Sequence, residues 1–134
     1  MGKSLIQTTN QSSQTVAVGS TISLGSVLRR FGCNCRLSGN SLEIEGEGYY
    51  EVDAAVTLTP NAVGNVTVAI YVDGVQVPGA VATAGVSTVG NSITLPIITT
   101  IRKGCCCDGA SMLTCVLVAG ASTVNNVSVR VSKA

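Results

Sequence analysis

Short stretches of alternating apolar and polar residues, separated by turn residues, run along most of this chain. In the clearest of them, residues 49–59, every second side chain is apolar and most of the others are charged or threonine. The same alternation returns at 66–72 and at 127–131. A period of two is typical of a strand with one buried face. No stretch of helical period follows a capping residue, so the pattern predicts an all-β chain.

Turn residues divide this pattern into about eight strands. Asp73-Gly74 is a hairpin signal, Pro60-Asn61 ends a strand, and Pro78-Gly79 breaks another. Pro96 lies within the apolar run 93–101, which indicates an edge strand or a bulge. The spacing predicts a two-sheet antiparallel jelly-roll sandwich.

The length of 134 residues predicts one domain, which we place at 14–134. Residues 1–13 are mostly polar, and we expect them to form a flexible N-terminal arm that anchors the domain to a neighbour. The chain has neither an apolar run of signal-peptide length at its start nor a stretch of about 18 apolar residues elsewhere. We therefore expect neither signal-dependent secretion nor a membrane partner.

Two predicted strands, 93–101 and 112–118, are apolar on both faces. A strand in a two-sheet sandwich usually keeps one face in water, so a second apolar face predicts a covering subunit. Charged residues make up only 11% of the chain, against about 25% in an average domain, which also favours a covered surface. The predicted oligomer interface consists of Ile93, Leu95, Ile97, Ile98, Leu113, Val116 and Val118.

Two segments resemble a known family. The stretch Gly48-Tyr49-Tyr50-Glu51-Val52-Asp53-Ala54 and the stretch from Asn65 to Ala80 are similar to the trimeric jelly rolls of the tumour-necrosis-factor and complement-globular-head type. The similarity is greatest to small phage or prophage versions and to the C-terminal domains of collagen-like spore-surface glycoproteins. It implies a homotrimer with an apolar axis and a role in coats, capsid decoration or fibres. No Gly-x-y repeat accompanies the domain, which favours head decoration over a spore filament.

Several function classes are disfavoured by what the chain lacks. It contains no histidine, which removes the usual general base and the main neutral metal ligand. It has no phosphate-binding loop of the required spacing. The net charge is +1 with scattered basic residues, so we expect no nucleic-acid partner. The sequence therefore predicts a protein that is not an enzyme and binds no cofactor.

Six cysteines are the most unusual feature: Cys33, Cys35, Cys105, Cys106, Cys107 and Cys115. On extended backbone Cys33 and Cys35 share a face, as do Cys105 and Cys107, and four thiolates could hold zinc. Neither pair has the usual spacing of a zinc knuckle, however. A disulfide or thiol cluster of Cys33, Cys35, Cys105, Cys106 and Cys107 is a second interpretation. Cys115, in an apolar strand, is expected to be a buried thiol. For the other five, buried or free thiols rank first, disulfides next and metal last.

Acidic residues cluster around one predicted strand. Glu43, Glu45 and Glu47 would share a face, where they could bind Ca²⁺ together with loop carbonyls. The interpretation we favour is the solvated face of an edge strand, where charge prevents edge-to-edge aggregation.

Together these features predict a non-enzymatic structural protein, a self-assembling jelly roll. We expect a homotrimer, made in the host cytoplasm, that decorates a phage capsid or forms part of a virion fibre, with a capsid or surface lattice protein as partner. A coat or fibre protein of a bacterial spore or cell surface is one alternative. A carbohydrate- or receptor-binding module is another, with Phe31, Tyr49 or Tyr71 as the aromatic contact.

Overall fold

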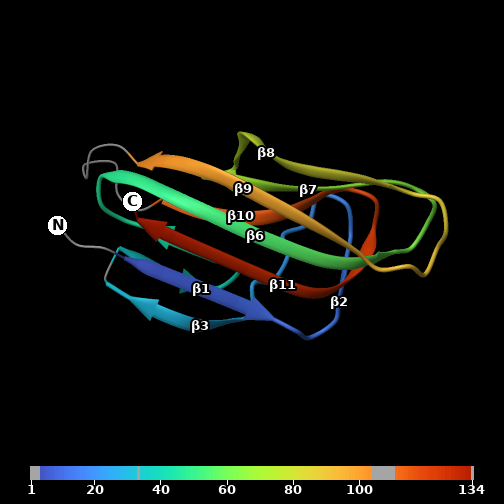
Figure 1. The fold of residues 1–134 in the computed structure, drawn as a ribbon, viewed down its shortest axis with the longest axis horizontal. Coiled ribbons are helices and arrows are strands. Elements are labelled where there is room, and N and C mark those ends of the chain that lie inside the picture. Colours follow the sequence, from blue (N-terminus) through green and yellow to red (C-terminus); the bar gives the residue numbers. More distant parts are fainter. Residues whose placement is uncertain (1–3, 33, 104–110, 134) are drawn as a thin grey trace.

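The computed structural model describes residues 4–32, 34–103 and 111–133. These residues form two antiparallel sheets that face each other (Figure 1). The first sheet has the order β3 (Ser26–Phe31), β1 (Leu5–Asn10), β11 (Ser122–Lys133), β6 (Gly48–Pro60) and β9 (Ile93–Lys103), and β2 (Gln14–Val16) also pairs with β11. The second has the order β4 (Cys35–Ser38), β5 (Ser41–Ile44), β10 (Ser111–Ala119), β7 (Gly64–Val72) and β8 (Val75–Val86). No helix able to cross a membrane occurs in the described part of the chain.

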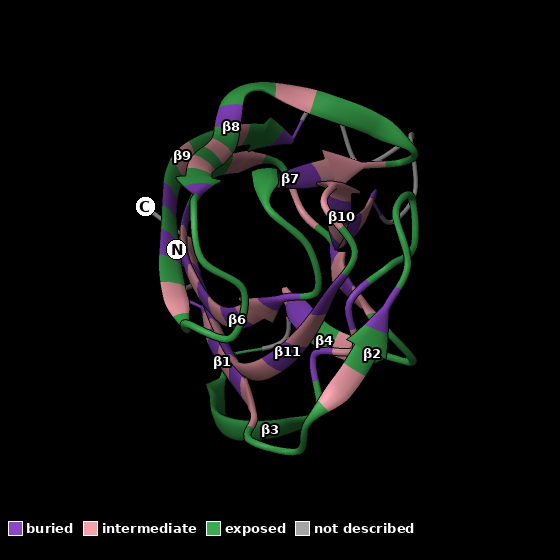
Figure 2. Cartoon of the chain, turned by 90° about the vertical axis from the view of Figure 1, so that its right-hand side faces the viewer, coloured by how far each residue is buried: buried purple, intermediate pink, exposed green. Residues whose placement is uncertain are grey.

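The core lies between the two sheets and consists almost entirely of aliphatic side chains. Buried residues alternate with more exposed ones along the strands (Figure 2). Val52, Val56 and Leu58 of β6 face Val68 and Ile70, which are also buried, from the other sheet. Tyr50 brings a polar group to this core, and its hydroxyl lies 2.7 Å and 2.8 Å from the carbonyl oxygens of Glu45 and Gly46. The predicted all-β, two-sheet jelly roll is confirmed.

The turn chemistry explains where most strands end. Asp73 and Gly74 have φ of 52° and 83°, which is the backbone of a tight hairpin turn between β7 and β8. The Asp73 carboxylate also accepts a hydrogen bond of 2.9 Å from the backbone N–H of Met112, which ties the hairpin to β10. Pro60 is the last residue of β6, and Pro96 lies in β9 at the edge of the first sheet, both as predicted.

The expected break at Pro78-Gly79 is wrong, because β8 continues through it. The pairing of β7 with β8 shifts register between Ala69 and Tyr71, which places an irregularity opposite this dipeptide. β8 is the edge of its sheet, so a proline there removes no hydrogen bond that the ladder needs. Gly79, with φ of 83°, absorbs the backbone distortion.

The flexible N-terminal arm is also wrong for the segment from Ser4 to Asn10. Residues 5–10 form β1, which lies inside the first sheet between β3 and β11. Ile6 and Thr8 are fully buried, and Ser4 is nearly so. The physical reason is that the side of β11 away from β6 has backbone groups that need partners. All six residues of β1 pair with β11 there, opposite residues 127–132. The prediction of an arm was based on the low apolar content of this segment. A strand held mainly by backbone hydrogen bonds does not need a high apolar content.

Candidate functional site

The outer face of the first sheet contains an open hollow of about 500 Å³. The register of three strands explains it. Ala55 of β6 lies opposite Ser128 of β11 on one side and Pro96 of β9 on the other, so a row of short side chains crosses the sheet. The hollow is lined by Gln7, Asp53, Ala54, Ala55, Pro96, Ile97, Ile98, Ser128 and Arg130.

The next row along this face is long and chemically mixed. It runs Gln7, Arg130, Asp53, Ile98 across β1, β11, β6 and β9. Arg130 and Asp53 form an ion pair, with both side chains about half exposed. Ile98 is 78% exposed, the largest value among the exposed bulky apolar side chains in the described part of the chain. An aliphatic side chain of this exposure beside a hollow is a surface that gains stability when it is covered.

On the other side of the hollow, the polar groups of this face bond to one another. The hydroxyls of Thr57 and Thr94 lie 2.9 Å apart, and those of Thr59 and Ser92 lie 3.0 Å apart. The side-chain amide of Asn125 donates to Thr59 at 2.8 Å. Because these groups already have partners, a covering surface would displace water from them at little cost in lost hydrogen bonds. We call this group the hydroxyl ladder.

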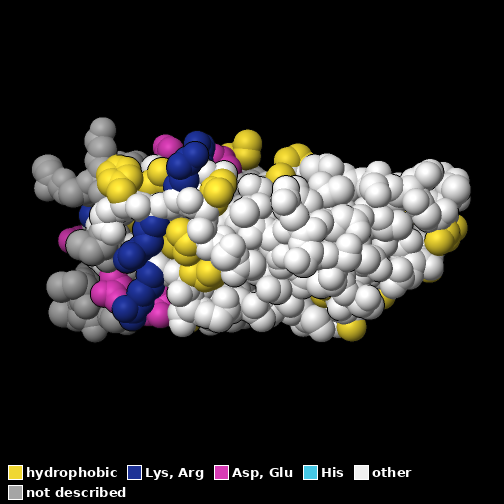
Figure 3. Space-filling view, turned by 90° about the horizontal axis from the view of Figure 1, so that it is seen from below, with side chains coloured by type: hydrophobic (Ala, Val, Ile, Leu, Met, Phe, Trp, Pro, Cys, Tyr) yellow, Lys and Arg dark blue, Asp and Glu magenta, His cyan; other side chains and the backbone are white. Residues whose placement is uncertain are grey.

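Charge is restricted to one end of the molecule. The segments 4–28, 54–72, 74–101 and 109–129 contain no charged residue. On the side seen in Figure 3, the Lys, Arg, Asp and Glu side chains gather at the end where β1 begins and β11 ends, and the rest of that side is uncharged. The hollow lies between this charged end and the uncharged hydroxyl ladder.

The predicted interface residues divide into three groups in the structure. Leu95, Ile97 and Leu113 are buried between the sheets, so their side chains have almost no surface to offer a partner. Ile93, Val116 and Val118 are partly buried. Ile98 points outward on β9, at the rim of the hollow. The strand 93–101 is thus apolar on its outer face mainly through Pro96 and Ile98.

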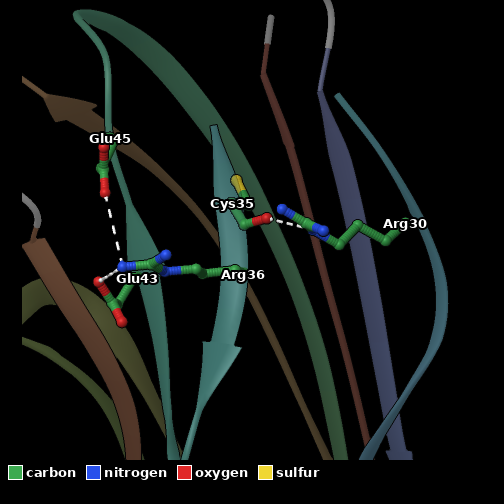
Figure 4. A network of polar contacts seen from close by, with 5 residues as sticks. All are labelled: Arg30, Cys35, Arg36, Glu43 and Glu45. Atoms are coloured by element: carbon green, nitrogen blue, oxygen red, sulfur yellow. Dashed lines mark hydrogen bonds and ion pairs between the residues drawn. The ribbon is translucent and has the colours of Figure 1, made fainter. Parts of the chain in front are cut away.

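The acidic residues that we expected on an edge strand are in a different setting. β5 lies between β4 and β10, so the edge-strand interpretation is wrong. Arg36 of β4 reaches across to the carboxylates of Glu43 at 3.1 Å and Glu45 at 4.0 Å (Figure 4). The hydrogen bond from Arg36 lowers the pKa of Glu43, and the same contact raises the pKa of the Arg36 guanidinium. The outer face of this sheet therefore carries an ion-pair network at its charged end.

Two cysteines can be placed. Cys35 and Cys115 are free thiols buried in the core, and burial raises the pKa of Cys35 to about 11 and that of Cys115 to about 12. Both are therefore protonated and unreactive at neutral pH, as expected for Cys115. Cys33, Cys105, Cys106 and Cys107 lie outside the described residues. Within the described residues no three potential ligands come together as a metal site.

No protein-family model matches the chain, and no curated protein is similar to it in sequence. Its fold, in contrast, has solved counterparts. Murine APRIL superimposes with a TM-score of 0.78 at 8% identity, over 99% of this chain and 100% of that one. The globular domain of zebrafish complement 1qA protein gives 0.70 at 6% identity, over 94% of each chain. The PRD1 vertex protein P5 gives 0.61 at 12% identity, over 97% of this chain and 96% of that one.

The chain has the jelly-roll fold of the tumour-necrosis-factor and complement globular-head proteins. At these identities the likeness is one of fold alone.

The sequence pattern does not predict the hollow or the ion pair beside it. Asp53 and Arg130 are 77 positions apart, and Ala55, Pro96 and Ser128 come from three strands. A weak signal was present, because each of these five residues occupies an outward position in its strand. Only the pairing of β6 with β9 and β11 brings them together.

Proposed function

We propose that this chain is a non-enzymatic structural protein that self-associates through the outer face of its first sheet. The observation that carries the proposal is Ile98, 78% exposed at the rim of a hollow that is crossed by the short side chains of Ala55, Pro96 and Ser128. A second copy that covers this face would bury Ile98 and meet the hydroxyl ladder, whose polar groups are already bonded. The resemblance to the trimeric jelly rolls supports three copies in the assembly.

Light scattering after size-exclusion chromatography tests this assembly. We expect three times the 13.5 kDa mass of the chain for the unmodified protein. Ile98→Asp should shift the mass to that of the monomer, because it places a carboxylate in the covered face. Val75→Asp is the matched control, since Val75 is 68% exposed on the second sheet and should leave the trimer intact. A clean monomer of the unmodified protein at micromolar concentration would contradict the proposal.

We further propose that the assembly decorates a phage capsid or forms part of a virion fibre. Two things support this role: the resemblance to small phage and prophage jelly rolls, and the shared fold of a phage vertex protein. Mass spectrometry of density-purified virions from a strain that encodes the chain should detect its peptides. Their presence in purified spores or cell walls, with none in virions, would favour the coat alternative instead.

A carbohydrate- or receptor-binding module is the alternative from another class. Arg102 lies over the ring of Tyr49, 5.9 Å from its centroid, so one face of that aromatic is already covered. Phe31 is 54% exposed and offers a free apolar ring. A glycan array tests this alternative, and specific binding that Phe31→Ala abolishes would favour it over a purely structural role.

A further inference from the structure

β3 forms an open edge of the first sheet. All six of its residues are exposed (Figure 2), and among the described strands it pairs with β1 alone. The backbone N–H and C=O groups along its other side therefore have no strand partner in the described part of the chain. Natural proteins usually protect such an edge, because unpaired backbone groups can accept a strand from another chain.

The side chains beside this edge form a small site of mixed chemistry. A hollow of about 440 Å³ is lined by Leu5, Leu28, Arg29, Arg30 and Phe31. Leu28 is 52% and Phe31 54% exposed, which is unusual for apolar side chains at an unprotected edge. Figure 3 looks at the molecule from the side of β3, and Lys or Arg side chains lie next to hydrophobic ones at its charged end.

The two arginines of this hollow differ in their contacts. Arg30 is held by a hydrogen bond of 2.7 Å from its Nε to the carbonyl oxygen of Cys35 (Figure 4). No carboxylate of the described residues lies within ion-pair distance of Arg29. Arg29 and Phe31 are two positions apart on the strand and pair with Gln7 and Leu5, so both belong to the outer face of the sheet. A cation and an aromatic ring thus lie side by side along a free edge.

Charge decides which kind of strand can pair here. Two copies of β3 placed edge to edge would bring both Arg29-Arg30 pairs within a residue or two of each other, and like charges at such positions destabilise a sheet. The acidic β5 of another copy is not available, because β4 and β10 already pair with it on both sides. The edge therefore suits a strand from a different protein, with a carboxylate opposite Arg29 and an apolar residue opposite Phe31.

We propose that β3 is a docking edge that accepts an extended acidic segment of a partner protein as an additional strand. Backbone hydrogen bonds to the free edge supply affinity, while Arg29 and Phe31 select an acidic and an apolar residue two positions apart. The proposal goes beyond self-association, since it needs only the β3 edge and not Ile98 or the hollow on the sheet face.

Fluorescence anisotropy with labelled peptides on the full chain tests it. The probe is a repeat of Glu-Thr-Val-Thr, which presents Glu and Val on one face of a strand; the matched probe replaces each Glu with Lys. Two further versions are N-methylated at alternate positions, in either phase. We expect the acidic probe to bind, the basic probe not to bind, and only one methylated phase to weaken binding, because only one set of N–H groups faces the protein.

Charge reversal on the protein completes the test. Arg29→Glu should weaken binding of the acidic probe by about tenfold and create binding of the basic probe. Arg102→Glu, an exposed arginine at the opposite edge of the same sheet, should change neither. Light scattering of both variants separates the two proposals, since Arg29→Glu should keep the mass of the unmodified protein.

Each of these binding results would overturn the docking edge: no binding of the acidic probe to the unmodified chain, equal binding to Arg29→Glu, or insensitivity to both N-methylated phases. A change in oligomer mass in Arg29→Glu would do so as well, because it would assign β3 to a contact between copies.

Discussion

The two sheets have equivalent inner faces and very different outer faces. Each contributes fully buried Val, Ile and Leu side chains to one shared core. On the outside, the second sheet pairs Arg36 with Glu43 and Glu45, and Thr67 with Thr83 at 3.0 Å. The first sheet also pairs its polar groups, in the hydroxyl ladder and in the Asp53–Arg130 pair, but between them it has a hollow with Ile98 exposed at its rim. Both sheets have edge strands, and β3 differs in that all six of its residues are exposed. The hollow with its apolar rim and the exposed β3 edge are the features that suit a partner.

The largest expected effect tests the equivalence of the inner faces. Leu58→Ala in the first sheet and Leu117→Ala in the second each remove a fully buried side chain. Each should lower the free energy of unfolding by about 2–5 kcal/mol, through lost burial and the cavity left behind. Chemical denaturation monitored by circular dichroism measures both. A large loss in one sheet with none in the other would show that the sheets do not share one cooperative core.

A smaller effect is expected from the polar group inside the first sheet. Tyr50→Phe keeps the ring but removes the hydroxyl that bonds to the carbonyl oxygens of Glu45 and Gly46. The free energy of unfolding should fall by about 1–2 kcal/mol, because these part-buried carbonyls lose a donor. The same denaturation experiment measures it, with Tyr71→Phe as the control. Equal losses in the two variants would mean that the Tyr50 hydroxyl contributes nothing specific.

The Asp53–Arg130 pair on the first sheet should have a weak intrinsic coupling. Both side chains are about half exposed in the single chain, so a double-mutant cycle with Asp53→Asn and Arg130→Gln should give about 0–1 kcal/mol. Measured on the assembled protein, the coupling should be larger, because a covering copy removes the screening water. The comparison can be made on an Ile98→Asn monomer and the unmodified protein, because an added carboxylate at position 98 would lie opposite Asp53 and change the coupling itself. Identical couplings in the two would contradict the burial of this face.

The smallest effect concerns the ion pair of the second sheet. The hydrogen bond from Arg36 lowers the pKa of Glu43 in the folded protein below its value in the unfolded chain. The pair therefore contributes its full stability above the unfolded pKa. That contribution is lost as the pH falls through the folded pKa. Titration of the Glu43 carboxyl by NMR should give a value below the ordinary range, and Arg36→Gln should raise it. If the pKa of Glu43 is the same in both proteins, the pair does not form in solution.

Local pattern predicted much of the inner architecture. The alternation over 49–59 corresponds to β6, and Asp73-Gly74 makes the turn between β7 and β8. The pattern missed β1, whose fully buried Thr8 is polar, and β3, whose residues are all exposed. Alternation marks a strand only where one face is apolar and buried. A strand that buries a single apolar side chain, as β1 buries Ile6, or none, as in β3, leaves no such signal.

The sequence by itself determined the class of fold, the alternating face of β6 and the turn between β7 and β8. These follow from preferences that each residue expresses locally, such as apolar periodicity and the turn geometry of Asp-Gly. Only the tertiary structure decided that Asp53 meets Arg130, that Ala55 lies between Ser128 and Pro96, and that β3 is an open edge. Strand order and register depend on contacts between residues far apart in the chain, and those contacts select among pairings that the local pattern leaves equally favourable.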